Sequence, residues 1–522
     1  MNPGPRHAVA CRARVASTDG VWRILRTVIA RLRQSNAVLP LSEAAVLVVL
    51  PAAIFAIAMG SSSEGWAVRL GGQLRWVMLF ALVACAVPYG LSQLRLLPRT
   101  FLAVTASLVG VALLSAFWSV TPRLSAERAI SFLALMVAVV CLGSGASRSG
   151  RRIERLFVSL LIAADLVGLA GLVVLVVDHN LAIQAGVPTM PGRLRGFGEN
   201  PNTAAMLFAL ALPLAEWLVV SGRGVLMRLV GVASFTLLYG SIMASGSRGA
   251  LLAATAASIV FGAVLIRNIR RLVVLEMVAV AFFAGSFQIA GSRPSDFPTP
   301  ALPVSTSPVV VPVLPAAGGS AAGGPTAPPP NSRVPSTAPP RSPTEIGIKQ
   351  GLTRADVSVP FVPRSSEIGY PYIYDSKPIM TYGSGRVLAW LWAIRQGLEV
   401  PLLGYGFGTE STVFVDRFYV FEGSYTENSF VGMFLQLGLV GTLLLLLPFL
   451  LIGRAVLRAR REFGAYDRGV VGATAGMVAG GLAVALFQSY LYSVGNMAAL
   501  TFWAGATTVI AVTANPQRSV ER

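Results

Sequence analysis

Long apolar runs recur along the sequence and determine its architecture. A helix needs about 20 apolar residues to cross the ~30 Å hydrocarbon core of a bilayer. Twelve segments of about that length are predicted to be membrane-spanning helices: residues 42–60, 75–93, 100–118, 127–145, 156–177, 202–220, 224–245, 249–266, 271–290, 428–452, 469–488 and 495–513. The sequence therefore predicts an all-α polytopic membrane protein with about 12 transmembrane helices and one large external loop.

These helices form two membrane segments, residues 42–290 with nine helices and residues 428–513 with three. Residues 1–41 precede them and residues 514–522 follow. In residues 1–41, apolar positions recur at helical spacing among arginines, which is typical of an amphipathic helix on an anionic membrane surface. A helix that binds a partner protein is the alternative.

A long loop joins the two membrane segments. Residues 291–345 are rich in Pro, Ala, Ser, Thr and Gly, a composition that predicts disorder. Residues 346–427 regain Tyr and Trp, so we expect them to fold partly against the membrane domain. Between Gly385 and Leu398 the spacing predicts a helix with several larger side chains close to one face: Leu388, Leu391, Trp392 and Arg395.

Composition and charge agree with this topology. Hydrophobic residues make up 54% of the chain and charged residues only 12%, too little polar surface for a protein in water. With a cytoplasmic amino terminus, 25 Lys and Arg fall on the inside and seven in the short outside loops. That bias follows the positive-inside rule and places both termini in the cytoplasm. The net charge of +19 therefore reflects topology in the inner membrane, with no nucleic-acid partner expected.

Other residue types limit the chemistry. The three cysteines, Cys11, Cys85 and Cys141, lie outside the predicted external loops, so no disulfide framework is expected. Histidines are too few for a metal site, and no Asp-x-Asp pair or phosphate-binding loop occurs. We expect no metal and no cofactor. Asp165, midway along a predicted helix, is a functional or a structural intramembrane carboxylate.

Three arginines are predicted at the outer membrane edge. Arg193 and Arg195 lie in a glycine-rich loop that ends with Asn202, and Arg248 begins a later helix. Free N–H groups at a helix start bind anions, and the planar guanidinium matches phosphate oxygens. The alternative is that these arginines reach toward lipid headgroups.

The end of the long loop supplies the last candidates. Asn428 is placed to cap the following helix, and Gly438 and Gly441 would allow tight helix packing. Glu427 is either a general base or a favourable charge at a helix start.

The order of these motifs resembles the O-antigen ligase and O-antigen polymerase superfamily of lipid-linked glycan ligases and exopolysaccharide polymerases. The likeness covers about residues 115–445. It also includes Ala116–Pro122, Ser384-Gly-Arg386 and Pro401–Gly408. The resemblance implies a C-type glycosyltransferase-like fold. It also implies metal-independent, inverting glycan transfer from a polyprenyl-diphosphate donor to a glycan or glycolipid acceptor, on the outer face of the inner membrane.

The resemblance further implies that Arg195 and Arg248 grip the donor diphosphate and that a histidine assists the acceptor. This chain has Glu427 at the histidine position. A carboxylate can accept a proton from a sugar hydroxyl, so a polymerase becomes at least as well supported as a ligase. The predicted site thus has Glu427, Arg195 and Arg248 as catalytic residues. Its substrate-binding residues are Arg193, Asn202, Arg386 and Asn428.

A lipid-linked glycan flippase or other polysaccharide transporter is the rival interpretation. Such a protein would also have about twelve helices and charges within the membrane. It would be expected to place charges along a central cavity and would rarely carry so long an external loop. The position of the arginines relative to Glu427 distinguishes the two classes.

Overall fold

The computed structural model describes most of the predicted helices. It covers residues 38–62, 65–184, 192–197, 200–222, 224–266, 386–414 and 425–514, with single positions at 277, 281 and 285. Several predictions lie outside the described residues. They are the amphipathic helix in 1–41, the spanning helix at 271–290, the disorder of 291–345, all of 346–385 and nearly all of the tail 514–522.

The described residues are almost entirely helical, as predicted. Ten helices are long and apolar enough to cross a membrane, which identifies a polytopic membrane architecture. In chain order the elements are α2 (Val38–Gly60), α3 (Gly65–Gly90), η1 (Leu91–Leu96), α4 (Arg99–Leu114), η2 (Ser115–Phe117), α5 (Pro122–Ala146), α6 (Gly150–Val177), α7 (His179–Ala182), β1 (Ile183–Gln184), β2 (Arg193–Leu194), α8 (Pro201–Ser221), α9 (Val225–Ser245), α10 (Arg248–Leu265), α14 (Arg386–Gly397), α15 (Glu410–Val413), α16 (Ser429–Glu462), α17 (Ala465–Ala485) and α18 (Met497–Thr513).

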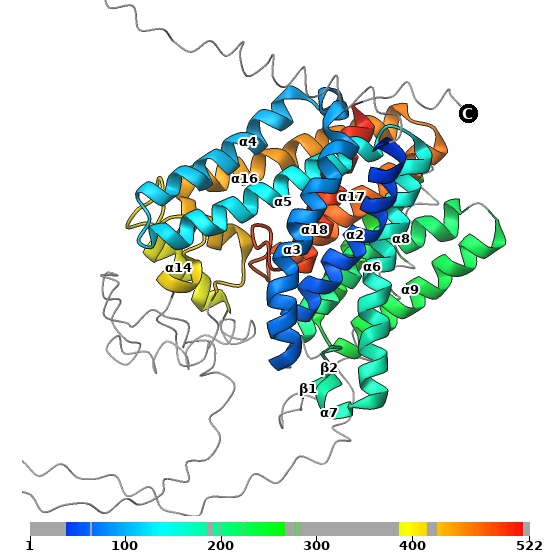
Figure 1. The fold of residues 1–522 in the computed structure, drawn as a ribbon, viewed down its shortest axis with the longest axis horizontal. Coiled ribbons are helices and arrows are strands. Elements are labelled where there is room, and N and C mark those ends of the chain that lie inside the picture. The colour runs from blue at the N-terminus through cyan, green and yellow to red at the C-terminus, as the bar shows by residue number, and fades with distance from the viewer. Residues whose placement is uncertain are drawn as a thin grey trace, which may run out of the picture.

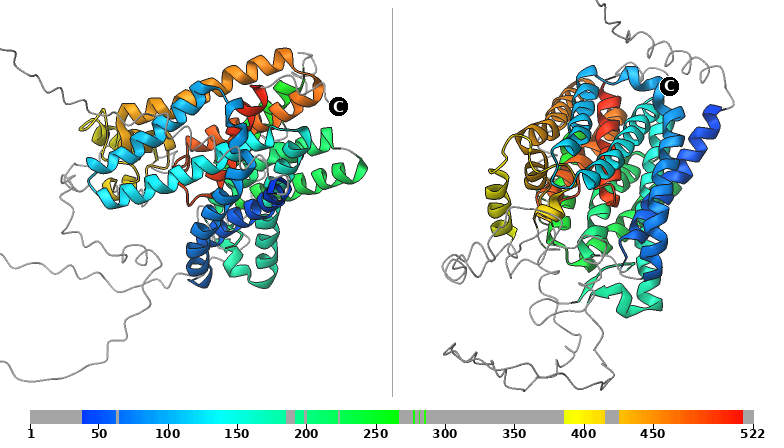
Figure 2. Two further views of the ribbon diagram at one scale, coloured as in Figure 1. Left: turned by 45° about the horizontal axis from the view of Figure 1, so that its top comes forward. Right: turned by 60° about the vertical axis from the view of Figure 1, so that its left-hand side comes forward.

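Helix α18 lies at the centre of the bundle. Its 17 residues are nearly all buried, and it packs on α2, α5, α8, α16 and α17 (Figures 1 and 2). The indole of Trp503 donates to the carbonyl of Leu491, 2.7 Å away, which holds the start of α18 against the segment before it. By contrast, only 28% of the residues in the most apolar stretch of α3, and of α9, are buried, as expected of helices that face lipid.

Several helices begin earlier than the hydropathy pattern predicts. Helix α3 starts at Gly65 and α5 at Pro122, so Arg75 and Arg128 lie several residues inside their helices and not at the helix starts. Polar residues in the first turns lower the mean hydropathy there, although the helix continues. Helices α2 and α3 can approach closely because Gly71 has no side chain. A Cβ at that position would lie 2.2 Å from the backbone nitrogen of Gly60.

Helix α14 confirms the helix predicted between Gly385 and Leu398. Its small residues, Ala389 and Ala393, face the protein, whereas Leu391 and Arg395 are exposed. The helix packs against α16, and both views show it at the end of that helix (Figures 1 and 2). Close packing of small side chains therefore sets its orientation.

Helix α16 is broken at Gly438, a feature that the sequence did not predict. Gly438 has φ 62° and ψ −156°, a conformation essentially restricted to glycine. The next residues after the break, Leu439 and Val440, donate their backbone N–H groups to the carbonyls of Pro401 and Leu402, at 2.8 and 3.3 Å. Gly438 thus admits a second backbone segment at this break, beyond the helix packing that we had expected of it.

Replacing Gly438 with alanine should destabilise the protein. The new Cβ would lie 2.4 Å from the carbonyl carbon and oxygen of Leu402, and the backbone strain adds about 1–3 kcal/mol. We expect a clear fall in the apparent melting temperature of the detergent-purified protein. Gly453 is the matched control on the same helix, because a Cβ there would meet nothing within 4 Å. Gly453→Ala should leave that temperature unchanged or slightly higher, and an equal fall in both variants would contradict this account.

Candidate functional site

A short β-hairpin orients the two arginines of the glycine-rich loop differently. Strands β1 and β2 are antiparallel, with Ile183 opposite Leu194 and Gln184 opposite Arg193. Just after β2, the guanidinium of Arg195 donates to the carbonyls of Leu181 and Asn180, at 2.7 and 3.3 Å. Arg195 therefore holds the hairpin onto α7.

Arg193 makes the contacts with the rest of the site. Its Nε donates to the carbonyl of Ser245 at 2.8 Å, and its Nη2 donates to Oδ1 of Asn202 at 2.7 Å. Burial lowers the pKa of the Arg193 guanidinium, and the neighbouring Arg386 charge lowers it further. Arg193 is therefore hydrogen-bonded to Asn202, and its charge interacts with that of Arg386.

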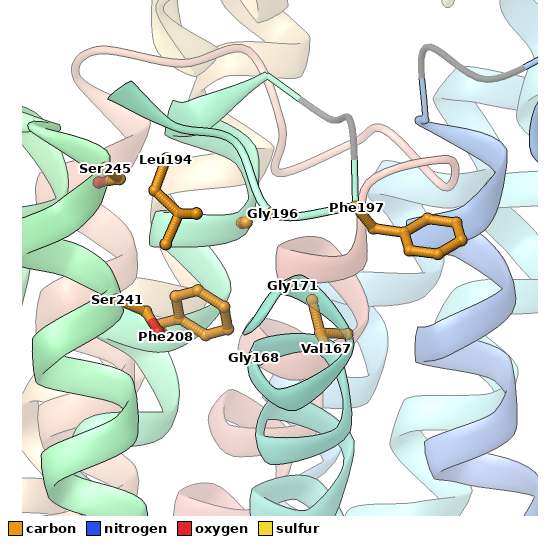
Figure 3. A pocket seen from close by; sticks show the side chains of 10 residues that line it. Val167, Gly168, Gly171, Leu194, Gly196, Phe197, Phe208, Ser241 and Ser245 are labelled. Atoms are coloured by element: carbon orange, nitrogen blue, oxygen red, sulfur yellow. The ribbon is translucent and has the colours of Figure 1, made fainter. Parts of the chain in front are cut away.

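A pocket lies beneath the hairpin. It is small, with a cavity volume of about 10 Å³, enough for about one water molecule, and it is lined by Val167, Gly168, Gly171, Leu194, Gly196, Phe197, Ala204, Phe208, Ser241 and Ser245. Figure 3 shows Leu194 and Gly196 above it and Phe208 and Val167 below, on the adjoining helices. The pocket is mostly apolar and shares Ser245 with Arg193, so an apolar surface adjoins the charged groups.

Arg248 begins α10, three residues after Ser245, whose carbonyl binds Arg193. The preceding Gly246 has a left-handed φ of 60°, and a Cβ there would lie 3.7 Å from Cγ and Nε of Arg193. Ser247 caps α10 by accepting the N–H of Ala250. The exposed Arg248 therefore shares one short segment with the carbonyl group that binds Arg193.

Glu427 and Arg386 form the ion pair of the site. Nε and Nη2 of Arg386 lie 2.8 and 2.5 Å from Oε2 of Glu427. Nε2 of Gln488 donates to the same oxygen at 3.1 Å. Glu427 has φ 51°, the only positive φ of a non-glycine residue in the described chain. Such strain costs about 1–3 kcal/mol and persists where the surroundings enforce it, often at functional sites.

Asn428 caps α16, as predicted. Its Oδ1 accepts the backbone N–H groups of Phe430 and Val431, at 2.9 and 3.2 Å. Its Nδ2 donates to the carbonyl of Leu486. This amide therefore links the start of α16 to the turn that carries Gln488, and it fixes the backbone next to Glu427.

A buried carboxylate that the sequence analysis missed organises this region. Oε1 of Glu410 accepts three hydrogen bonds of 2.8 Å, from the backbone and hydroxyl of Thr426 and the hydroxyl of Ser489. Its Oε2 accepts from Tyr492 at 2.6 Å and Gln436 at 3.2 Å. Burial raises the pKa of the Glu410 carboxyl, although these hydrogen bonds oppose that shift.

Glu410 had no distinguishing signal in the sequence. It lies in a polar loop with other acidic residues, and its five donors come from four distant positions. The only local hint is its place directly after the glycine-rich Pro401–Gly408 segment.

That glycine-rich segment pairs with two other motifs. Tyr405 and Gly406 donate their N–H groups to the carbonyls of Leu435 and Gln436, at 3.1 and 2.8 Å. The carbonyl of Tyr405 accepts the N–H of Val120, 3.1 Å away. Gly406 has φ 106°, and a Cβ there would lie 2.3 Å from the hydroxyl oxygen of Ser119. Three sequence motifs therefore meet at this segment.

The structure brings some of the predicted site residues into contact and leaves others apart. The structure links Arg193 with Asn202 and Arg386, joins Arg386 to Glu427, and leaves Asn428 beside them. Arg248 lies on the adjoining segment, whereas the guanidinium of Arg195 is bonded to the α7 carbonyls.

Comparison with known proteins finds no family model that matches this chain and no curated protein similar to it. The roles given to these residues stay predictions.

The hydrogen bonds of Glu410 can be tested by an isosteric exchange. In Glu410→Gln, the new amide N–H₂ would face Nε2 of Gln436, whose Oε1 is already bound to the N–H of Gly408. Leaving buried donors unsatisfied costs about 1–3 kcal/mol, so the apparent melting temperature should fall. Adding Gln436→Glu restores an acceptor for that amide and should recover much of the loss. A double variant no more stable than Glu410→Gln would contradict this arrangement.

Proposed function

We propose that this chain is a glycosyltransferase that moves a glycan from a polyprenyl-diphosphate donor to a glycan or glycolipid acceptor, as an O-antigen ligase or a polysaccharide polymerase does. In this proposal it works in cell-surface polysaccharide biosynthesis. Its site faces the outer side of the inner membrane, and both termini are cytoplasmic. The reaction is an inverting displacement that needs no metal.

The observation that carries the proposal is the ion pair between Arg386 and Glu427, together with a charge interaction between Arg386 and Arg193. Arg193, Arg386 and Glu427 come from segments far apart in the sequence, yet they interact electrostatically or by hydrogen bonds. Arg248 lies on the segment that binds Arg193. Such a cluster suits a reaction in which negative charge develops on a leaving diphosphate near a proton acceptor.

The donor would be held by Arg193 and Arg248. Arg193 has Asn202 and the Ser245 carbonyl to fix its guanidinium, and charge-assisted hydrogen bonds to phosphate oxygens are strong. In this arrangement Arg195 holds the hairpin in place and does not itself bind the diphosphate.

Glu427 would accept the proton of the attacking hydroxyl. Its side chain is 24% exposed, so an acceptor can approach it. Arg386 and Gln488 both bind Oε2, and neither hydrogen bond uses Oε1. The acceptor hydroxyl loses its proton to Oε1 as its oxygen bonds the anomeric carbon, and the bond to the diphosphate breaks with that electron pair.

A deletion strain complemented with variants tests this proposal. Glu427→Gln keeps the hydrogen-bonding shape but removes the base, which should lower transfer by roughly 10²–10⁴-fold. The strain should lose surface polymer and accumulate lipid-linked glycan at a normal level of membrane-inserted protein. Glu399→Gln is the control, because Glu399 is an exposed carboxylate bound to the hydroxyl of Tyr405, and it should complement fully.

Two outcomes would count against it. Full complementation by Glu427→Gln would remove the base from the mechanism. Normal polymer in the deletion strain itself would remove this chain from polysaccharide synthesis.

A further inference from the structure

Helix α14 and the turn that follows it carry exposed apolar side chains, although the sequence predicts that they belong to the external loop. Leu391, Ile394 and Leu398 recur at helical spacing along one face of α14, and Leu402 and Leu403 follow in the turn. We call these five exposed side chains the α14 apolar surface. Exposed apolar surface of this extent usually marks a contact with a membrane or with another protein.

Helix α16 indicates how deep this surface lies. Val440 donates its backbone N–H to the carbonyl of Leu402, 3.3 Å away, and the preceding Leu439 donates to Pro401 at 2.8 Å. The first charged residue after the start of α16 is Arg454. A hydrocarbon core of ~30 Å takes about 20 residues of helix, and tilt only lengthens that stretch. Counted back from Arg454, it extends beyond Leu439 toward the start of α16, so Leu402 is at the level of the outer leaflet.

The α14 apolar surface is continuous with a surface that faces lipid. Leu402 is 63% exposed, and Leu443 in the middle of α16 is 60% exposed. Leu439, which is also exposed, lies between them. Trp118 donates its indole N–H to the carbonyl of Leu403 at 3.2 Å, and it belongs to the outer turn between α4 and α5, a position that tryptophan favours at membrane surfaces. Both neighbours therefore place the turn at the outer side of the membrane and not in water.

The irregular backbone of this turn satisfies the condition that lipid imposes. Non-helical backbone at membrane depth is tolerated only where its polar groups are paired within the protein. Gly404 donates its N–H to the carbonyl of Val400 at 3.0 Å, while Tyr405 and Gly406 donate to carbonyls of α16. The carbonyls of Pro401 and of the next two residues accept from α16 and Trp118. The turn can therefore lie in lipid with these groups paired.

The two charged residues beside the surface limit how far it enters the membrane. The exposed Arg395 borders the apolar face, and its guanidinium lies 5.3 Å from the ring centre of Trp392. Long basic side chains reach headgroups from such positions. The carboxylate of Glu399 accepts the hydroxyl of Tyr405 at 2.7 Å. These charges fit a helix at the boundary between headgroups and acyl chains.

We propose that α14 and the turn up to Leu403 are inserted in the outer leaflet, with the α14 apolar surface in contact with lipid acyl chains. Lipid is the occupant, and not a protein partner, because the surface continues into the lipid-facing side of α16. In this proposal the segment belongs to the membrane domain. Arg386 begins α14, so insertion keeps the Arg386–Glu427 pair near the lipid headgroups. The use of that position by a lipid-linked donor rests on the proposed function, whereas the insertion itself does not.

Fluorescence quenching on the full-length protein in phosphatidylcholine nanodiscs tests this proposal. Cys11 and Cys85 are replaced by serine, and Cys141 is kept because its buried thiol would not be labelled. A bimane label is attached in turn at Leu391→Cys, Leu398→Cys and Leu402→Cys. The lipid quencher is phosphatidylcholine with a doxyl group near the top of its acyl chain, and the aqueous quencher is iodide.

Two further positions calibrate the measurement. Leu443→Cys reports a lipid-facing side chain in the middle of α16, and Asn180→Cys reports an exposed one on α7, beyond the outer end of α6. We expect doxyl lipid to quench labels on the α14 apolar surface to about half or more of the extent found for Leu443→Cys. Iodide should quench them much less than it quenches Asn180→Cys.

Two results would overturn the proposal. Quenching by iodide as strong as for Asn180→Cys, with little quenching by lipid, would place the surface in water. Protection from both quenchers would show that another protein segment covers it. Ile394→Cys and Leu403→Cys replace any variant whose size-exclusion profile shows that it is not folded. Because no glycan transfer is measured, either result leaves the proposed function to be judged by its own test.

Discussion

The buried carboxylate of Glu410 is the interaction on which the site depends most. It accepts hydrogen bonds from Thr426, Ser489, Tyr492 and Gln436, which belong to the segments on both sides of Glu427 and to the turn after α17. A carboxylate removed from water is costly unless donors surround it. Here the five donors compensate for that cost, and in return the carboxylate fixes three chain segments relative to one another. Glu427, Asn428 and Gln488 lie on those segments.

The break at Gly438 also fixes chain segments relative to one another, through backbone hydrogen bonds. The segment from Pro401 to Gly406 bonds to the backbone of α16 on both sides of the break. The same segment reaches Ser119 and Val120 before α5, and the nearby Gly408 packs against Arg128 of that helix. In a continuous helix, the backbone N–H and carbonyl groups at this point would be hydrogen-bonded within α16. The segment from Pro401 to Gly406 would then have no free backbone groups of α16 to bind.

The sequence predicted the membrane architecture well, because long apolar runs have few other interpretations. It placed the start of α3 ten residues late, since Arg69, Gln73 and Arg75 interrupt the apolar pattern while the helix continues through them. That error hid the position of Arg75. The sequence also grouped Arg193 with Arg195, and only hairpin geometry separates their guanidiniums. Glu410 and the break at Gly438 depend on contacts between distant segments, which no local pattern encodes.

The proposed function requires that this chain break the bond between a glycan and its lipid diphosphate. The direct test uses purified protein in liposomes that contain a lipid-linked glycan and an acceptor, with the polyprenyl diphosphate released and the glycan transferred both measured. Our account predicts equal amounts of the two products, with no loss of rate in the presence of a metal chelator. A glycan that crosses the bilayer still attached to its lipid would contradict the account and identify a transporter.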